Sequence, residues 1–186
     1  MKVNRNLAAL TALVLGLANV SGAQVTSSLQ TISLGAVKGE FITLGAPSPS
    51  SQSVSLVDAA INQYTTPFST SVSWDVTAPA STTVKLVAYF ANPAQALANG
   101  TDYIPSSKVE VSTDAGATWT PISGGAVGGV GTALGSVVLY TSPVTTGAGR
   151  TGTQSVTFLV RINLLSGPTT IAGSYAGTLN LMSACN

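Results

Sequence analysis

Residues 68–76 read FSTSVSWDV, a stretch in which apolar and small polar side chains alternate. Phe68, Val72 and Trp74 fall on one set of alternate positions, while the other set is polar throughout, from Ser69 to Asp75. Because successive side chains of a strand point to opposite faces of the sheet, this pattern predicts a strand with one buried and one solvated face. Half-buried strands of this kind are typical of antiparallel sheets.

The same alternation recurs along the chain. It is found at residues 84–90, 108–111, 156–162 and 175–181, and shorter stretches at 32–37, 41–44, 54–57, 118–122 and 134–140 also predict strands. Turn-forming residues separate them, and only Asp58 to Tyr64 and Pro93 to Ala98 predict short helices. We therefore predict an all-β protein, an immunoglobulin-like antiparallel β-sandwich of roughly nine or ten strands, with a β-barrel as the alternative.

The N-terminal residues have the features of a secretory signal. Lys2 and Arg5 precede an apolar run from Leu7 to Val20, which is shorter than the roughly 20 residues that a membrane-spanning helix needs. We expect residues 1–23 to be removed, leaving residues 24–186 as one domain without membrane insertion. The expected location is secreted, periplasmic or on the cell surface.

The composition argues against most catalytic chemistry. The chain has no His, so neither a His-containing triad nor a His-based zinc site can be built from it, and its six acidic residues show no calcium-loop spacing. We expect no enzyme activity, no cofactor and no metal. Removal of the signal would leave five basic and six acidic residues, which argues against a nucleic-acid partner.

Charge and cysteine content point instead to surface contacts. Charged residues make up only 7% of the chain, so copies repel one another weakly and self-association or binding to other surface proteins is favoured. Cys185 is the only cysteine, so an internal disulfide is excluded. Its thiol is predicted either to be free or to pair with a thiol of another molecule.

Residues 112–119 read STDAGATW and resemble the Asp-box motif, S-x-D-x-G-x-T-W. The resemblance implies a β-hairpin in which Ser112 opens the motif and Asp114 accepts backbone N–H bonds across the turn. Gly116 would supply a positive φ, and Trp119 would pack beneath the hairpin. We interpret the motif as structural, with a glycan-contacting hairpin as the alternative.

The C-terminal stretch 173–181, GSYAGTLNL, looks like the final strand of bacterial fimbrial subunits and spore coat protein U-like domains. The resemblance implies polymerisation, in which an N-terminal extension of one subunit completes the sandwich of the next. Ile32, Leu34 and Ala36, in residues 24–38, would then be the inserted side chains. The alternative is that this segment is the first strand of a self-complete sandwich.

Together these patterns predict an exported, non-catalytic structural or adhesive protein, such as a pilus-like or surface-layer subunit. The alternative is a secreted carbohydrate-binding module that uses a sheet face or the Asp114 hairpin. Tyr89, on a polar strand face, and Tyr103, in a predicted loop, are the candidate residues for contact with a surface partner or a glycan.

Overall fold

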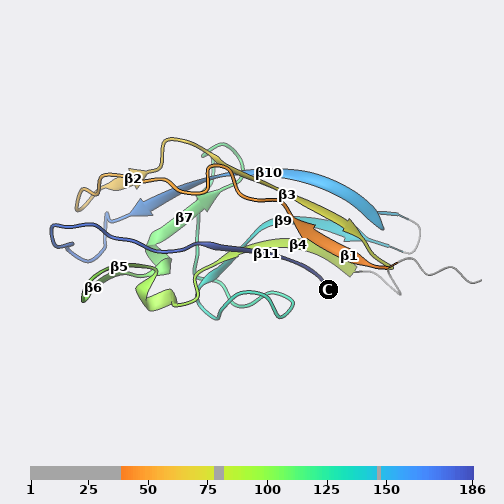
Figure 1. The fold of residues 1–186 in the computed structure, drawn as a ribbon. Helices are drawn as coiled ribbons and strands as arrows, with labels where there is room; N and C mark the ends of the chain where they lie inside the picture. The colour runs from red at the N-terminus through yellow and green to blue at the C-terminus, as the bar shows by residue number, and fades with distance from the viewer. Residues whose placement is uncertain (1–38, 78–81, 146–147) are drawn as a thin grey trace, which may run out of the picture. The chain divides into compact units, whose positions relative to one another are not determined.

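The computed structural model describes residues 39–77, 82–145 and 148–186, which are almost entirely strands and connecting loops (Figure 1). The predicted signal and the predicted donor segment lie outside the described residues. The strands are β1 (Phe41–Leu44), β2 (Ile61–Gln63), β3 (Phe68–Asp75), β4 (Thr82–Tyr89), β5 (Leu97–Asn99), β6 (Asp102–Ile104), β7 (Val109–Ser112), β8 (Thr120–Pro121), β9 (Ser136–Val144), β10 (Thr151–Asn163) and β11 (Asn180–Cys185). Two 3₁₀ turns accompany them, η1 (Pro93–Gln95) and η2 (Ser106–Lys108).

The larger sheet has six strands in the order β1-β3-β10-β7-β8, with β2 also paired to β10. Strand β10 organises this sheet because its 13 residues serve two sets of partners. Residues 151–158 pair with β3, and residues 159–162 pair with β7. All of these pairings are antiparallel.

A three-stranded antiparallel sheet, β11-β4-β9, packs against the larger one, and β5 and β6 form a separate hairpin. The core contains the apolar positions of the alternating strands, including Val72 and Trp74 of β3 and Leu86 of β4. Trp74 reaches across to Tyr140 of β9, with ring centroids 6.4 Å apart. Neither sheet closes on itself, so the predicted all-β antiparallel sandwich is confirmed over the barrel alternative.

The helix predicted at Asp58 to Tyr64 is wrong, because residues 61–63 are strand β2 and pair with β10. The Asn62 side chain accepts a hydrogen bond from the Val57 N–H at 2.7 Å and donates to the Val57 carbonyl at 3.1 Å. These bonds hold a tight loop in which Ala59 has a positive φ of 51°, a conformation that an α-helix excludes.

Three other segments differ from prediction. Within Pro93 to Ala98 only the turn η1 is helical, and strand β5 begins directly after Ala96. Residues 54–57, predicted as a strand, have no ladder partner in the described part of the chain. The final strand begins at Asn180, not at Tyr175, so residues 175–179 are likewise unpaired except for an isolated bridge at Ala176.

Residues 39–186 form one compact unit. Within the described ranges, no helix is both long enough and apolar enough to span a membrane.

Candidate functional site

A groove lies along one side of the sandwich, between residues 47–58 and residues 170–181. Its first wall forms because β1 stops at Leu44 and is followed by Pro47 and Pro49, which have no N–H to continue a ladder. Only the Ser48–Ser69 bridge still ties this wall to β3, through backbone bonds of 2.8 and 2.7 Å. Residues 49–60 then continue without a ladder partner in the described part of the chain, before β2 pairs with β10.

The second wall leads into β11 and is anchored to the β5–β6 hairpin. Ala98 and Ala176 exchange backbone bonds of 2.9 and 3.0 Å. A Cβ at Gly177 would lie 1.9 Å from the Ala96 carbonyl oxygen, so only glycine allows this wall to approach so closely. The Tyr175 hydroxyl donates to the Asp102 carboxylate, which fixes the wall farther along.

The half of the groove nearest β11 encloses about 360 Å³ over an apolar floor. Phe158 of β10 stacks on Phe68 of β3 at 5.6 Å between centroids, and Tyr64 meets Phe68 edge-on at 6.1 Å. Leu179 and Leu181 line the β11 side. Burial raises the pKa of the Tyr64 hydroxyl. The floor therefore consists of core side chains.

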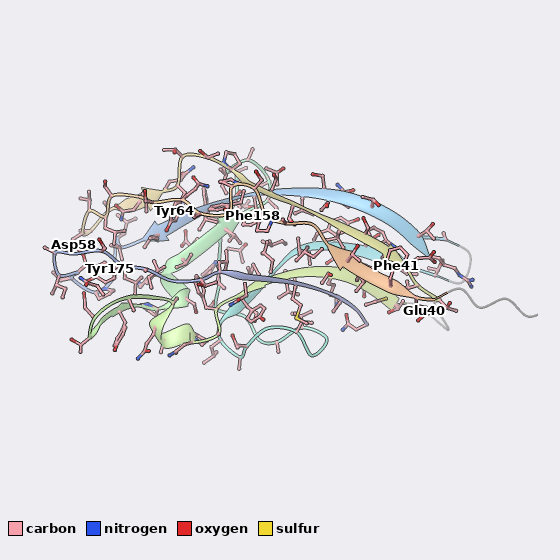
Figure 2. The ribbon with its side chains drawn as sticks, viewed as in Figure 1. Glu40, Phe41, Asp58, Tyr64, Phe158 and Tyr175 are labelled. Carbon is pink, nitrogen blue, oxygen red and sulfur yellow. The ribbon has the colours of Figure 1, made fainter. Side chains whose placement is uncertain are left out.

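The other half encloses about 490 Å³ and shares Gln52, Tyr64 and Leu97 with the first. At the end of this half, Asp58 joins the two walls. Its carboxylate accepts hydrogen bonds from the Thr170 N–H at 3.0 Å and the Thr170 hydroxyl at 2.6 Å. These bonds, the hydroxyl first, lower the pKa of Asp58 below its usual value. Figure 2 shows Phe158 and Tyr64 well inside the sandwich and Asp58 and Tyr175 at one end of it.

The groove combines two features that suit an extended polypeptide. Its floor is apolar, and β11 pairs with β4 on one side only, which leaves the other edge of β11 without a partner in the described residues. An unpaired strand edge offers N–H and C=O groups to an added strand. The described residues hold no cluster of three or more metal-ligating side chains.

The Asp114 hairpin lies elsewhere, between β7 and β8. Asp114 accepts hydrogen bonds from the Ser112 hydroxyl at 2.6 Å and from the Thr118 N–H at 2.9 Å and hydroxyl at 2.5 Å. These bonds, that of Ser112 first, lower the pKa of Asp114 from 3.8 to about 2. Gly116 has a φ of 92°, and its carbonyl accepts the Trp119 indole N–H at 3.0 Å. The hairpin's polar groups therefore bond mainly to one another.

Trp119 is covered on one ring face by Arg161, whose guanidinium carbon lies 4.2 Å from the ring centroid. Arg161 also pairs with Glu110 at 2.5 Å, and Asn163 donates to the same carboxylate at 3.0 Å. This arrangement locks the hairpin onto β10.

The remaining predicted residues lie apart from the groove. Tyr89 ends β4 and Tyr103 lies in β6, not in a loop, and both are partly buried. Cys185 is an exposed free thiol at the end of β11, 3.7 Å from the Thr82 hydroxyl. Ile32, Leu34 and Ala36 lie outside the described residues.

Sequence reasoning missed the groove, although two signals of it were present. Pro47 and Pro49 end the first ladder, and Val54 and Leu56 alternate with serines as a strand does, yet the turn that follows leads into β2, which pairs with β10 instead of with them. Both side chains pack against the core. The Asp58–Thr170 and Asp102–Tyr175 bonds join residues 112 and 73 positions apart, which no local pattern indicates.

No protein-family model matches the chain, and no curated protein or solved structure matches it significantly.

Proposed function

We propose that the protein is an exported, non-catalytic structural or adhesive subunit of a surface assembly, in which residues 24–38 of one copy occupy the groove of the next. The observation that carries this proposal is the groove: an apolar floor beside an edge of β11 that has no ladder partner among the described residues. A monomer that leaves such a site uncovered invites pairing with another chain.

Residues 24–38 have the pattern that this groove requires. Ile32, Leu34 and Ala36 fall on alternate positions and would share one face of a strand, spanning roughly 13 Å. That face would cover Phe68 and Phe158, while the donor backbone would bond to the free edge of β11. Affinity would come from the backbone bonds, and register from the apolar side chains.

The low charge of the chain supports the same function. An assembly of copies requires that their surfaces repel one another weakly, and only 7% of the residues are charged. The signal-like residues 1–23 support export to the surface or periplasm.

The test is deletion of residues 24–38 from the chain that begins at Gln24. The deletion variant is expected to be a folded monomer by size-exclusion chromatography and circular dichroism, whereas the intact chain forms filaments or oligomers visible by electron microscopy. Loss of the folded domain would contradict donation, because it would identify these residues as the sandwich's own first strand.

A matched pair of variants sharpens the test. Ile32→Asp with Leu34→Asp places charges on the face proposed to enter the groove and should abolish assembly. Thr31→Asp with Ser33→Asp adds the same charges to the opposite face and should leave assembly intact. Equal effects of the two pairs would contradict insertion of that face.

The carbohydrate-binding alternative would require exposed aromatic faces. Arg161 occupies one face of Trp119, and Tyr89 and Tyr103 are partly buried on separate strands. Glycan binding that is lost in Trp119→Ala or Tyr103→Ala, with the fold intact, would favour this alternative over assembly.

A further inference from the structure

Exposed aliphatic side chains gather at one end of the sandwich. We define the tip patch as Val57, Ile61, Leu165 and Ile171, whose exposed fractions are 60%, 43%, 60% and 57%. Backbone and side-chain bonds bring their segments together: Leu164 N–H bonds to the Ala60 carbonyl at 2.9 Å, and Asp58 holds Thr170 beside Ile171. Four of the eight large hydrophobic side chains exposed in the described residues therefore belong to this one end.

The charged groups beside the tip patch are bonded within the protein. Asp58 Oδ1 accepts two hydrogen bonds from Thr170, Asp102 accepts the Ile171 N–H at 3.1 Å, and the Lys108 ammonium donates to the Ser166 carbonyl at 2.9 Å. Contiguous exposed apolar side chains of this kind mark protein–protein contact sites. The patch is also continuous with the groove, because Ile171 and Asp58 line the groove's larger half.

The start of the described chain lies at the opposite end. Figure 2 shows Glu40 and Phe41 at one end of the sandwich and Asp58 at the other. Phe41, at the start of β1, is 48% exposed, and the Glu40 carboxylate accepts the Thr77 N–H at 2.6 Å, which fixes this end. A donor segment that ends at Lys38 therefore leaves its own sandwich at the end far from the tip patch.

Chain length then restricts where a donor copy can sit. Only five residue steps separate Ala36, the last proposed groove residue, from Phe41, and they span at most about 18 Å. The donor's Phe41 end must therefore lie close to the acceptor's groove. The larger half of the groove lies beside the tip patch, where the Asp58–Thr170 hydrogen bonds join its walls, and at the other end of the groove β1 and β11 approach each other.

We propose that the tip patch is a docking face for a second copy of this chain, which it contacts with the end that carries Phe41. This inference rests on the proposed function, since it uses the donated segment to set the distance between copies. The contact is head-to-tail: each copy receives a neighbour at its tip patch and presents its Phe41 end to the next. Such a heterologous interface repeats along a line and builds a filament.

The test compares variants of exposed side chains that do not line the groove. Val57→Ser with Leu165→Ser removes two tip side chains that do not line the groove, and Leu134→Ser removes an aliphatic side chain that is 73% exposed elsewhere. In sedimentation velocity of the chain beginning at Gln24, the tip variant should raise the concentration for half-assembly about tenfold or more. The Leu134→Ser control should assemble as the unmodified chain does. Equal assembly of tip variant and control would overturn the proposal.

A cysteine pair provides a second measurement that does not depend on the tip variant's folding. In a Cys185→Ser background, Phe41→Cys with Leu165→Cys should give a ladder of disulfide-linked oligomers on oxidation. Phe41→Cys with Leu134→Cys should give none. Absence of a ladder from the first pair, or equal ladders from both pairs, would overturn the proposal.

The outcomes separate this proposal from donation. Assembly that is lost on deletion of residues 24–38 but indifferent to the tip variant would support donation and overturn tip docking. Assembly that survives the deletion but weakens in the tip variant would overturn donation and support the tip contact. An intact chain that stays monomeric at all concentrations would overturn both.

Discussion

Two regions of the sandwich, the Asp114 hairpin and the groove, differ in whether their side chains have partners within the protein. At the hairpin, Asp114 bonds to Ser112 and Thr118, and Arg161 covers Trp119. The polar groups and the indole ring therefore have partners within the protein. At the groove, core side chains such as Phe158 line a hollow beside β11, whose outer edge has no ladder partner in the part of the chain that the structure describes. The difference distinguishes a region whose polar groups bond to one another from a region whose apolar side chains line a groove.

The largest expected effect comes from the groove floor. Phe158→Ala removes a buried ring that stacks on Phe68 and should lower the free energy of unfolding by about 3–5 kcal/mol. Urea unfolding would measure this, with Leu134→Ala as an exposed control that should change little. A loss below about 1 kcal/mol would mean that the floor is not part of the core.

A smaller effect is expected at the groove wall. Gly177→Ala places a Cβ against the Ala96 carbonyl and should cost about 1–3 kcal/mol, because the wall must move away from β5. Gly125→Ala is the matched control, since nothing lies within 4 Å of a Cβ there. Equal thermal midpoints for the two variants would contradict the close approach of the wall.

At the Asp114 hairpin, Arg161→Met should lower the free energy of unfolding by about 1–2 kcal/mol. It removes both the contact with the Trp119 ring and the ion pair with Glu110, which are partly shielded from water. A double-mutant cycle with Trp119→Leu would measure the coupling. Zero coupling would show that the stacking contributes nothing to the hairpin.

The smallest expected effect is the acid sensitivity of the hairpin. The pKa of Asp114 is about 2 in the folded protein against an ordinary 3.8, so its carboxylate stabilises the fold fully above about pH 4. That contribution should fall as the pH drops from about 4 to 2. The lowered pKa values of Glu40 and Asp58 act in the same direction.

The difference in thermal midpoint between the intact chain and Asp114→Asn isolates the Asp114 contribution. The intact chain should be the more stable at pH 6, and the gap should close toward pH 2. A gap that stays constant over this range would contradict the assignment of the lowered pKa to Asp114.

Local sequence patterns predict the paired strands better than they predict the groove. The alternation at residues 68–76 and 156–162 predicts strands β3 and β10, because each buries one face along its length. The pattern at residues 54–57 predicts an extended segment but not its missing partner. Ladder pairing depends on segments far apart in the chain, so the same local alternation serves a paired strand and a groove wall alike.

The prediction of a helix at Asp58 to Tyr64 was wrong for a related reason. A short segment with a few apolar residues is compatible with either a helix or a strand. Here the long-range pairing of Ile61 with Asn163 of β10 stabilises the strand. The candidate site required the same kind of information, since its two walls are more than 100 residues apart in the sequence.

Amide hydrogen exchange of β11 tests the central claim most directly. In the assembled protein, the amides of β11 that lie next to the groove-lining Leu181 and face away from β4 should be protected, because a donated strand pairs with them. In the variant lacking residues 24–38 those amides should exchange rapidly, while the amides that bond β4 to β9 stay protected in both forms. Equal protection of the outward β11 amides in the two forms would contradict the groove as a strand-binding site.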